Sequence, residues 1–253
     1  MKQRIFEIKE NRQIAEGTFK MVLKGDTADA GGSGKFVNIS LPGLFLRRPI
    51  SICDLSGGEL TLVYKVVGKG TGDMAQMQPG ETLDLLTGLG NGFDVSACRK
   101  EALLLGGGVG TAPLVFLARE LVAIGKRVTA LLGFNKASEI MLADELRSLG
   151  ATVFIATLDG SQGTRGFVTD ILKEKAGTGN PITFDCFYAC GPMPMLKALC
   201  SAIDAPGEVS LEERMGCGFG ICYGCSCHTT AGPRRVCADG PVFKKEELIW
   251  QQK

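Results

Sequence analysis

The chain has 253 residues, which is enough for two domains or one large one, and a hydrophobic content of 45% provides for a substantial core. Its net charge of +1 gives no electrostatic footprint for nucleic acid. No apolar run is long enough to cross a membrane and the N-terminus lacks the apolar stretch of a signal peptide, so the ten cysteines are expected to stay reduced in the cytoplasm.

The first segment, residues 1–97, has the pattern of a small β-barrel. Apolar residues alternate with other residues in Thr18–Lys24 and again in Glu81–Leu85, and Gly57-Gly58 separates two apolar runs as a hairpin turn would. The stretch 26–35 is rich in Gly, Ala and Asp and is expected to be a loop. Short strands separated by Gly and Pro, without a helical stripe, are typical of barrels.

Two short motifs in this segment are suited to phosphate. Arg48 precedes Pro49, Ile50 and Ser51, and an arginine on a stiff strand offers a planar, permanently charged fork to a pyrophosphate. The Gly-rich stretch 68–72, which includes Gly70 and Thr71, is expected to be a turn whose backbone N–H groups face phosphate. Taken alone, each motif also fits a plainer interpretation, namely a surface arginine pair and an ordinary turn.

Residues 98–210 alternate between strand and helix patterns. Strands are predicted over 102–105, 127–134, 151–157 and 182–189, and helices over 114–124, 138–149, 167–176 and 192–203. This alternation predicts a parallel sheet with helices on both faces. Ligands of such sheets bind beyond the carboxyl ends of the strands.

Three of those strand ends carry groups suited to a dinucleotide. The Gly-rich turn Gly106–Thr111 precedes a helix, whose N-terminus favours a pyrophosphate, although its spacing is not a clean G-x-G-x-x-G. Asp159 follows the third predicted strand, and Cys190–Met193, which also fits a simple strand-to-helix turn, follows the fourth. No acidic residue directly ends the strand 127–134 and no arginine cluster awaits a 2′-phosphate, which favours NAD over NADP and leaves Asp159 as the candidate ribose ligand.

The last segment, residues 211–253, contains four cysteines with the spacing of a plant-type [2Fe–2S] loop. Cys217, Cys222 and Cys225 follow the pattern C-x4-C-x2-C, and Cys237 comes after eleven further residues. Interleaved glycines allow the backbone to wrap a cluster. A zinc site usually has two cysteine pairs and remains an alternative, as do structural thiols, whereas a Rieske centre needs two histidines and the chain has one. Cys227 and the five remaining cysteines are expected in the core.

In this order, the motifs resemble the ferredoxin reductase superfamily. More closely, Glu213–Cys222 and Cys237–Phe243 are similar to the electron transfer subunit of class 1B dihydroorotate dehydrogenase, and the resemblance covers essentially the full length. It implies an FAD-binding β-barrel over 1–97, a parallel-sheet NAD-binding α/β domain over 98–210 and a C-terminal [2Fe–2S] domain over 211–253.

The resemblance also implies three sets of binding residues. FAD would be held by Arg48, Pro49, Ile50, Ser51, Val63, Tyr64, Lys65, Gly70 and Thr71, with Lys65 standing where an arginine is commoner. NAD would enter between two turns and contact Gly106, Gly107, Gly108, Gly110, Thr111, Cys190, Gly191, Pro192 and Met193, with Asp159 nearby. The cluster ligands would be Cys217, Cys222, Cys225 and Cys237.

The function implied by the resemblance is that of an oxidoreductase subunit. A catalytic subunit that contains FMN oxidises dihydroorotate in de novo pyrimidine (UMP) biosynthesis, and this chain passes the electrons singly through the cluster to FAD and then, as hydride, to NAD+. A heterotetramer of two plus two subunits is implied, and no residue of this chain is expected to act as a general acid or base.

Two alternatives to this function stay open. One is a subunit of the same build that works between NAD(P)H and ferredoxin, sulfite reductase or hydrogenase. In flavin-bifurcating relatives an aspartate takes the first ligand position, where this chain has Cys217. The other alternative is a zinc-binding interaction module without enzymatic activity.

Overall fold

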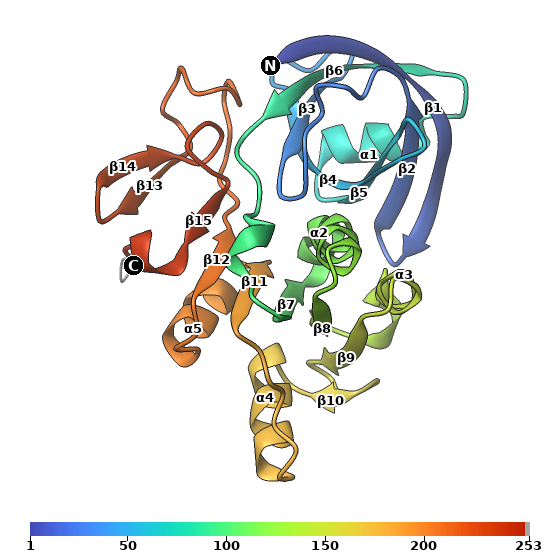
Figure 1. The fold of residues 1–253 in the computed structure, drawn as a ribbon. Helices are drawn as coiled ribbons and strands as arrows, with labels where there is room; N and C mark the ends of the chain where they lie inside the picture. Colours follow the sequence, from blue (N-terminus) through green and yellow to red (C-terminus); the bar gives the residue numbers. More distant parts are fainter. Residues whose placement is uncertain (251–253) are drawn as a thin grey trace.

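Alternating apolar side chains close the N-terminal part of the chain into a barrel with the strand order β1-β2-β5-β4-β3-β6 (Figure 1). The computed structural model describes residues 1–250 and gives the barrel strands as β1 (Lys2–Ala15), β2 (Thr18–Lys24), β3 (Phe36–Ser40), β4 (Arg48–Ser56), β5 (Glu59–Lys65) and β6 (Thr82–Leu89). All neighbouring strands pair antiparallel. The predicted barrel is therefore confirmed.

One element of the barrel differs from its prediction. The turn expected at residues 68–72 is wrong, because helix α1 (Lys69–Gln76) begins there. Its glycines lower helix propensity, but Met74 is fully buried in the barrel core, and this tertiary packing offsets the weak local preference. The helix therefore directs its first turn, with Gly70 and Thr71, toward β4.

The second unit is a seven-stranded sheet in the order β10-β9-β8-β7-β11-β12-β15. Its strands are β7 (Glu101–Gly107), β8 (Arg127–Phe134), β9 (Thr152–Thr157), β10 (Thr164–Arg165), β11 (Cys186–Cys190), β12 (Gly207–Ser210) and β15 (Val242–Lys244). All pair parallel except β15, which is antiparallel to β12. The predicted parallel sheet is confirmed, although β10, β12 and β15 are too short to show a pattern in the sequence.

Helices cover both faces of this sheet, as predicted. Helices α2 (Ala112–Ala123) and α3 (Ala143–Ser148) contribute to one hydrophobic core, and α4 (Val168–Gly177) and α5 (Met193–Ala202) to another. The helix predicted over 138–149 is wrong in its N-terminal half. A short 3-10 turn at Ala137–Glu139 is followed by Leu142 in the left-handed conformation (φ 60°), which interrupts the helical backbone.

The C-terminal segment leaves the sheet after β12, forms the hairpin β13 (Ser226–Thr229) and β14 (Gly232–Arg235), and returns as β15. Figure 1 shows this orange and red segment beside the barrel. Phe36 and Leu89 of the barrel share a core with Cys225 and Cys237. The seven-stranded sheet thus includes a strand, β15, that lies beyond residue 210 in the sequence. The three predicted domain limits stay predictions. Within the described part of the chain, no helix combines the length and apolar character needed to cross a membrane.

Candidate functional site

The four predicted cluster cysteines come together as two pairs. The backbone N–H groups of Ile221 and Cys222 donate to Cys217 Sγ at 3.3 and 3.4 Å, and the Cys217 N–H donates to Cys222 Sγ at 3.4 Å. The Cys237 N–H donates to Cys225 Sγ at 3.4 Å. One pair is on the outer loop, and the other, Cys225 with Cys237, is almost completely buried.

This pairing fits two irons better than one zinc ion. Within residues 1–250, the one group of three or more metal-binding side chains whose ligand atoms all lie within 4.8 Å is elsewhere, at Cys98, Asp185 and Cys186. The cluster thiols are therefore not gathered around a single point, as a tetrahedral zinc site requires. Four thiolates arranged as two pairs match a [2Fe–2S] cluster, in which each iron has two protein ligands.

Cys217 of the outer pair and Cys237 of the inner pair differ in electrostatic environment. Burial raises the pKa of the Cys217 thiol, but the N–H groups of Phe219, Cys222 and Ile221 outweigh it and lower the pKa to about 6. Burial, with the neighbouring Cys225, raises the pKa of the Cys237 thiol to about 12. Because the thiolate is the metal ligand, Cys217 is prepared for iron, whereas Cys237 loses its proton on binding.

Arg235 fastens the outer loop to the hairpin. Its guanidinium donates to Asp239 through Nε and Nη2, at 2.9 and 3.0 Å, and to the Gly220 carbonyl through Nη1 at 2.6 Å. It also lies 4.9 Å from the ring centroid of Tyr223, which has a left-handed backbone (φ 57°). Arg235 thus holds both flanks of Cys222 in place.

The group at Cys98, Asp185 and Cys186 has a structural explanation. Asp185 accepts hydrogen bonds from the N–H groups of Arg99, Lys100 and Glu101 at 2.9, 2.7 and 3.0 Å. The carboxylate therefore caps the start of β7, and burial raises the pKa of both thiols. These two cysteines are core residues, as expected. Cys53 is buried too, and Cys190, Cys200 and Cys227 are half-buried.

The two neighbouring arginines of the predicted flavin motif, Arg47 and Arg48, make different contacts. Arg47 forms an ion pair with Asp84 at 3.1 Å and donates to the Asn38 and Asp84 carbonyl oxygens, so it joins β3 to β6. Arg48 instead lies over the first turn of α1: a Cβ at Gly70 would come within 2.9 Å of its Cζ. A guanidinium beside a helix N-terminus is suited to phosphate. Arg48 is followed along β4 by Pro49, Ile50 and Ser51, all half-buried.

The remaining predicted flavin residues differ in how much of the side chain is accessible. Val63 and Tyr64 on β5 are buried, and the Tyr64 hydroxyl donates to Asn11 Oδ1 at 2.9 Å. Any contact from Tyr64 is therefore expected to come from its backbone. Lys65 is half-exposed and pairs with Glu139 at 3.3 Å. The Thr71 hydroxyl accepts from the Val67 N–H at 3.0 Å, so it orders the turn before α1.

The structure brings the two predicted NAD turns into backbone contact. Gly106 pairs with Cys190 between β7 and β11, so the turns that follow them are neighbours. A Cβ at Gly110 would lie 2.6 Å from the Cys190 carbonyl carbon and 2.7 Å from the Gly191 nitrogen. Gly107 is equally confined, by Met195 Sδ at 2.7 Å and Pro192 Cδ at 2.8 Å. Only glycine permits this approach.

Two further observations concern the predicted NAD residues. Thr111 is fully buried, and its hydroxyl has no hydrogen-bond partner among the described residues, as expected of a group kept for a ligand. Asp159 follows β9, which β8 separates from β7, and its carboxylate accepts from the Ser161 N–H and hydroxyl at 2.9 and 2.6 Å. Asp159 therefore lies at the carboxyl edge of the sheet, but its carboxylate is already engaged in its own turn. Gly108 begins the 3-10 turn Gly108–Thr111, whereas Pro192 directly precedes α5 and Met193 begins that helix.

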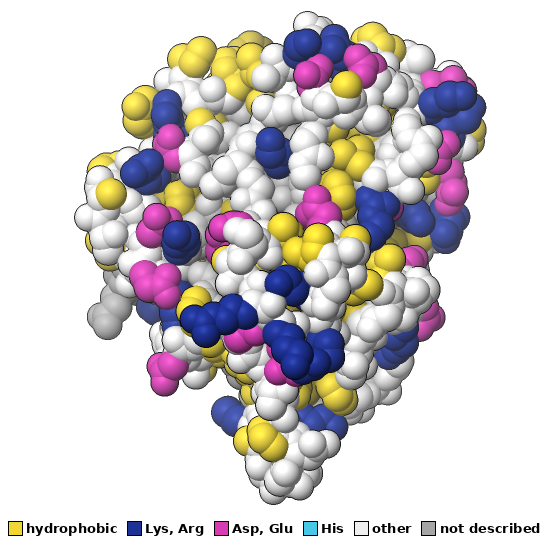
Figure 2. All heavy atoms as spheres, viewed as in Figure 1, with side chains coloured by type: hydrophobic (Ala, Val, Ile, Leu, Met, Phe, Trp, Pro, Cys, Tyr) yellow, Lys and Arg dark blue, Asp and Glu magenta, His cyan; other side chains and the backbone are white. Residues whose placement is uncertain are grey.

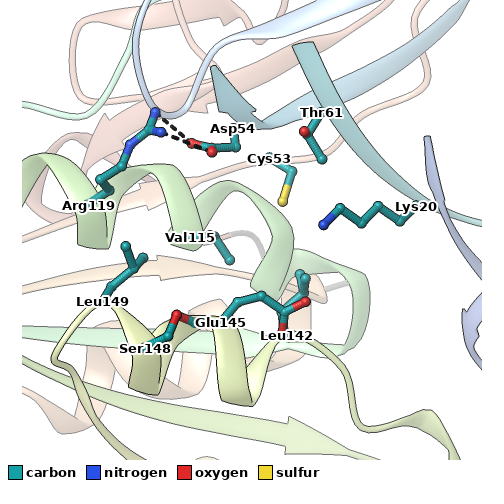
Figure 3. Close-up of a pocket in the computed structure, with 10 residues that line it drawn as sticks. All are labelled: Lys20, Cys53, Asp54, Thr61, Val115, Arg119, Leu142, Glu145, Ser148 and Leu149. Carbon is teal, nitrogen blue, oxygen red and sulfur yellow. Dashed lines mark hydrogen bonds and ion pairs between the residues drawn. The ribbon is translucent and has the colours of Figure 1, made fainter. Parts of the chain in front are cut away.

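A pocket of about 180 Å³ lies on another part of the molecule, between β4, α2 and α3 (Figure 3). The Arg119–Asp54 ion pair lines one side and Lys20 points in from the other. Burial raises the pKa of the Cys53 thiol in its wall to about 12. None of the residues predicted to bind a cofactor lines this pocket.

Two asparagines near the cluster were not singled out by the sequence. Asn91 donates to the Val242 carbonyl at 2.8 Å and accepts from the Val242 N–H at 3.0 Å. Asn38, on β3, donates to the Cys217 carbonyl at 3.2 Å. A polar residue between Val37 and Ile39 was the available signal for Asn38.

Comparison with known proteins identifies the same regions. Residues 212–249 match the family described as the iron-sulfur cluster binding domain of dihydroorotate dehydrogenase B, and residues 104–201 match an oxidoreductase NAD-binding domain. A curated protein of Fusobacterium nucleatum, the electron transfer subunit of dihydroorotate dehydrogenase B (NAD(+)), is 44% identical over 95% of this chain and 96% of its own length. The protein of the same name from a Geobacillus species is 42% identical over 98% and 99% of the two chains.

Solved structures support the architecture. The NADH-dependent reduced ferredoxin-NADP oxidoreductase, studied for flavin-based electron bifurcation, is 30% identical with a TM-score of 0.87, covering 97% of this chain and 90% of its own. A ferredoxin NADP+ reductase from Neisseria gonorrhoeae shares the fold at 18% identity, with a TM-score of 0.67 over 78% and 88% of the two chains. The full-length similarity to the curated relatives shows that the chain belongs to the family of dihydroorotate dehydrogenase B (NAD(+)) electron transfer subunits.

Proposed function

We propose that this chain transfers electrons from an FMN-containing dihydroorotate dehydrogenase subunit to NAD+, in a cytoplasmic heterotetramer of two plus two subunits that serves pyrimidine biosynthesis. The names of the full-length relatives support the reaction. The observation that carries the proposal is that the inner cysteine pair, Cys225 and Cys237, shares an apolar core with Phe36 of β3, whose neighbour β4 contains the flavin motif.

The proposed ligands follow from the geometry of the site. Cys217, Cys222, Cys225 and Cys237 would hold a [2Fe–2S] cluster, and Arg48, with the first turn of α1, would hold the FAD pyrophosphate. When bound, the cluster supplies one-electron chemistry and the flavin links it to the two-electron chemistry of NAD+.

The chain's own residues would bind and orient these groups rather than move protons. The turns Gly106–Thr111 and Cys190–Met193 would admit the dinucleotide beyond the carboxyl ends of β7 and β11. The buried hydroxyl of Thr111 offers a donor or an acceptor there. The substrate dihydroorotate would bind to the catalytic subunit.

The surface around the outer cysteine pair is suited to that partner. Phe219, Ile221 and Tyr223 alternate with glycine and cysteine in the cluster loop, and their exposed fractions are 38%, 74% and 60%. Figure 2 shows hydrophobic side chains at the upper left of the molecule, where Figure 1 shows the orange loop. Exposed apolar groups beside a redox centre are expected where a partner docks.

Reconstitution tests the proposal. The chain is co-expressed with an FMN-containing dihydroorotate dehydrogenase barrel, the complex is purified anaerobically, and NAD+ reduction by dihydroorotate is measured with and without this chain. We expect NADH only from the complex, and iron and sulfide in equal amounts. Equal NAD+ reduction by the barrel alone would refute the electron-transfer role.

A second candidate is electron transfer between NAD(P)H and ferredoxin, favoured by the similarity to a reduced ferredoxin-NADP oxidoreductase. The same preparation distinguishes the two when ferredoxin replaces the dihydroorotate-oxidising subunit. The matched iron-sulfur domain sets the zinc-binding module aside.

A further inference from the structure

Asn38 stands between the proposed flavin strand and the proposed cluster. It lies in the middle of β3 and pairs in register with Pro49 of β4. Directly opposed residues of antiparallel strands project from the same face of the sheet. The Asn38 side chain and Pro49 therefore share the outer face of the barrel, next to the cluster segment.

The contact of Asn38 with the cluster loop is direct and close. Its Nδ2 donates to the Cys217 carbonyl at 3.2 Å. Gly218, with φ at 77°, completes the contact: a Cβ there would lie 3.2 Å from Asn38 Cγ and closer still to Nδ2. The amide thus holds the peptide unit that follows the first proposed ligand.

Packing alone does not explain an asparagine at this position. Its neighbours on the same face, Phe36 and Leu86, pack in the apolar core shared with the cluster segment. Asn38 is 1% exposed, and its Oδ1 lacks a hydrogen-bond partner within the described residues. A buried unpaired acceptor is unfavourable, so an apolar residue would pack at least as well.

The backbone of Asn38 is fixed as well. Arg47 Nη1 donates to the Asn38 carbonyl at 3.2 Å and to the Asp84 carbonyl at 3.1 Å. The next residue, Arg48, reaches α1 in the other direction. Asn38 therefore connects the cluster loop to a rigid part of the barrel that also carries the flavin motif.

We propose that Asn38 is a positioning residue that sets the reduction potential of the cluster and its placement against the flavin strand. The inference rests on the proposed function. An N–H donor on the ligand's own peptide draws negative charge away from the iron–sulfur centre, which favours the reduced state. Removing the donor therefore disfavours the addition of one electron to the cluster.

An EPR-monitored redox titration of the intact FAD- and cluster-loaded chain, with dithionite as the reductant, tests the proposal. Asn38→Leu removes the donor at similar volume, and we expect the equilibrium constant for one-electron reduction to fall about tenfold, equivalent to about 59 mV. The flavin potentials should not change. Asn38→Asp should lower the cluster potential further, because it adds a negative charge, and Asn38→Gln should restore it in part.

Ser40→Ala is the matched control, because Ser40 lies two residues along β3 on the same face and pairs with Asp84 instead. An unchanged cluster potential in iron-replete Asn38→Leu would overturn the proposal. Loss of iron from all three Asn38 variants, Gln included, would also overturn it, because Asn38 would then be only structural. A wild-type chain without iron or flavin would instead refute the proposed function itself.

Discussion

A methyl group added at Gly110 should weaken NAD+ binding while the flavin and cluster sites stay intact. The new Cβ would lie 2.6 Å from the Cys190 carbonyl carbon, whereas Cβ atoms essentially never approach within 3.0 Å. The two turns must then separate by about 0.4 Å or more, and overpacking of this kind costs about 1–3 kcal/mol. Each 1.4 kcal/mol, approximately, is a tenfold change in affinity, so we expect NADH to bind to Gly110→Ala about 10- to 100-fold more weakly.

The assay is NADH binding to the intact complex, followed by flavin reduction in rapid mixing. Dihydroorotate oxidation with an artificial electron acceptor should continue in the variant. Gly177→Ala is the control, because Gly177 ends α4 in the same part of the chain and a Cβ there meets nothing within 4 Å. An unchanged NADH affinity in a folded Gly110→Ala protein would show that the dinucleotide does not enter between these turns.

Arg48→Ala should lose FAD on gel filtration, whereas Arg47→Ala should keep FAD and unfold at lower temperature, because Arg47 joins β3 to β6. Similar flavin content in both variants would contradict this assignment. Arg235→Gln should release iron to a chelator faster than wild type, because the contact of Arg235 with the Gly220 carbonyl in the cluster loop is lost. The control Arg234→Gln removes the same charge from an exposed neighbouring residue and should release iron at the wild-type rate. Burial raises the pKa of Asp185, but backbone N–H groups outweigh it and lower the pKa from 3.8 to about 2, so its ionised form stabilises the fold above the unfolded pKa. That stability is lost as the pH falls through about 2, and acid unfolding of Asp185→Asn should therefore show a weaker pH dependence between 3.8 and about 2.

Elements with strong local patterns were predictable from the sequence. The runs at 102–105 and 127–134 became central strands, and the Gly-rich turn after the first of them lies next to Cys190–Met193 as a parallel sheet requires. The cysteine spacing likewise predicted a shared site, and the structure places Cys217 beside Cys222 and Cys225 beside Cys237, while their role as cluster ligands stays a prediction.

Features that depend on tertiary contact were not predictable. Helix α1 contains two glycines and depends on the burial of Met74 in the barrel. Strand β1 carries many charged residues because much of its outer face is exposed, so its alternation is weak. Asn38 and Cys217 are 179 residues apart in the chain, and no local pattern relates them.

The antiparallel strand β15 brings residues that follow the cluster segment into the seven-stranded sheet. Residues 211–241 thus form a long connection between two paired strands, and its two ends meet where Ser210 pairs with Val242. Removing Val242–Lys244 would take away the edge strand of the sheet, and during synthesis that edge cannot form until the cluster segment 211–241 has been made. Iron loading and completion of the seven-stranded sheet are therefore expected to be linked events in maturation.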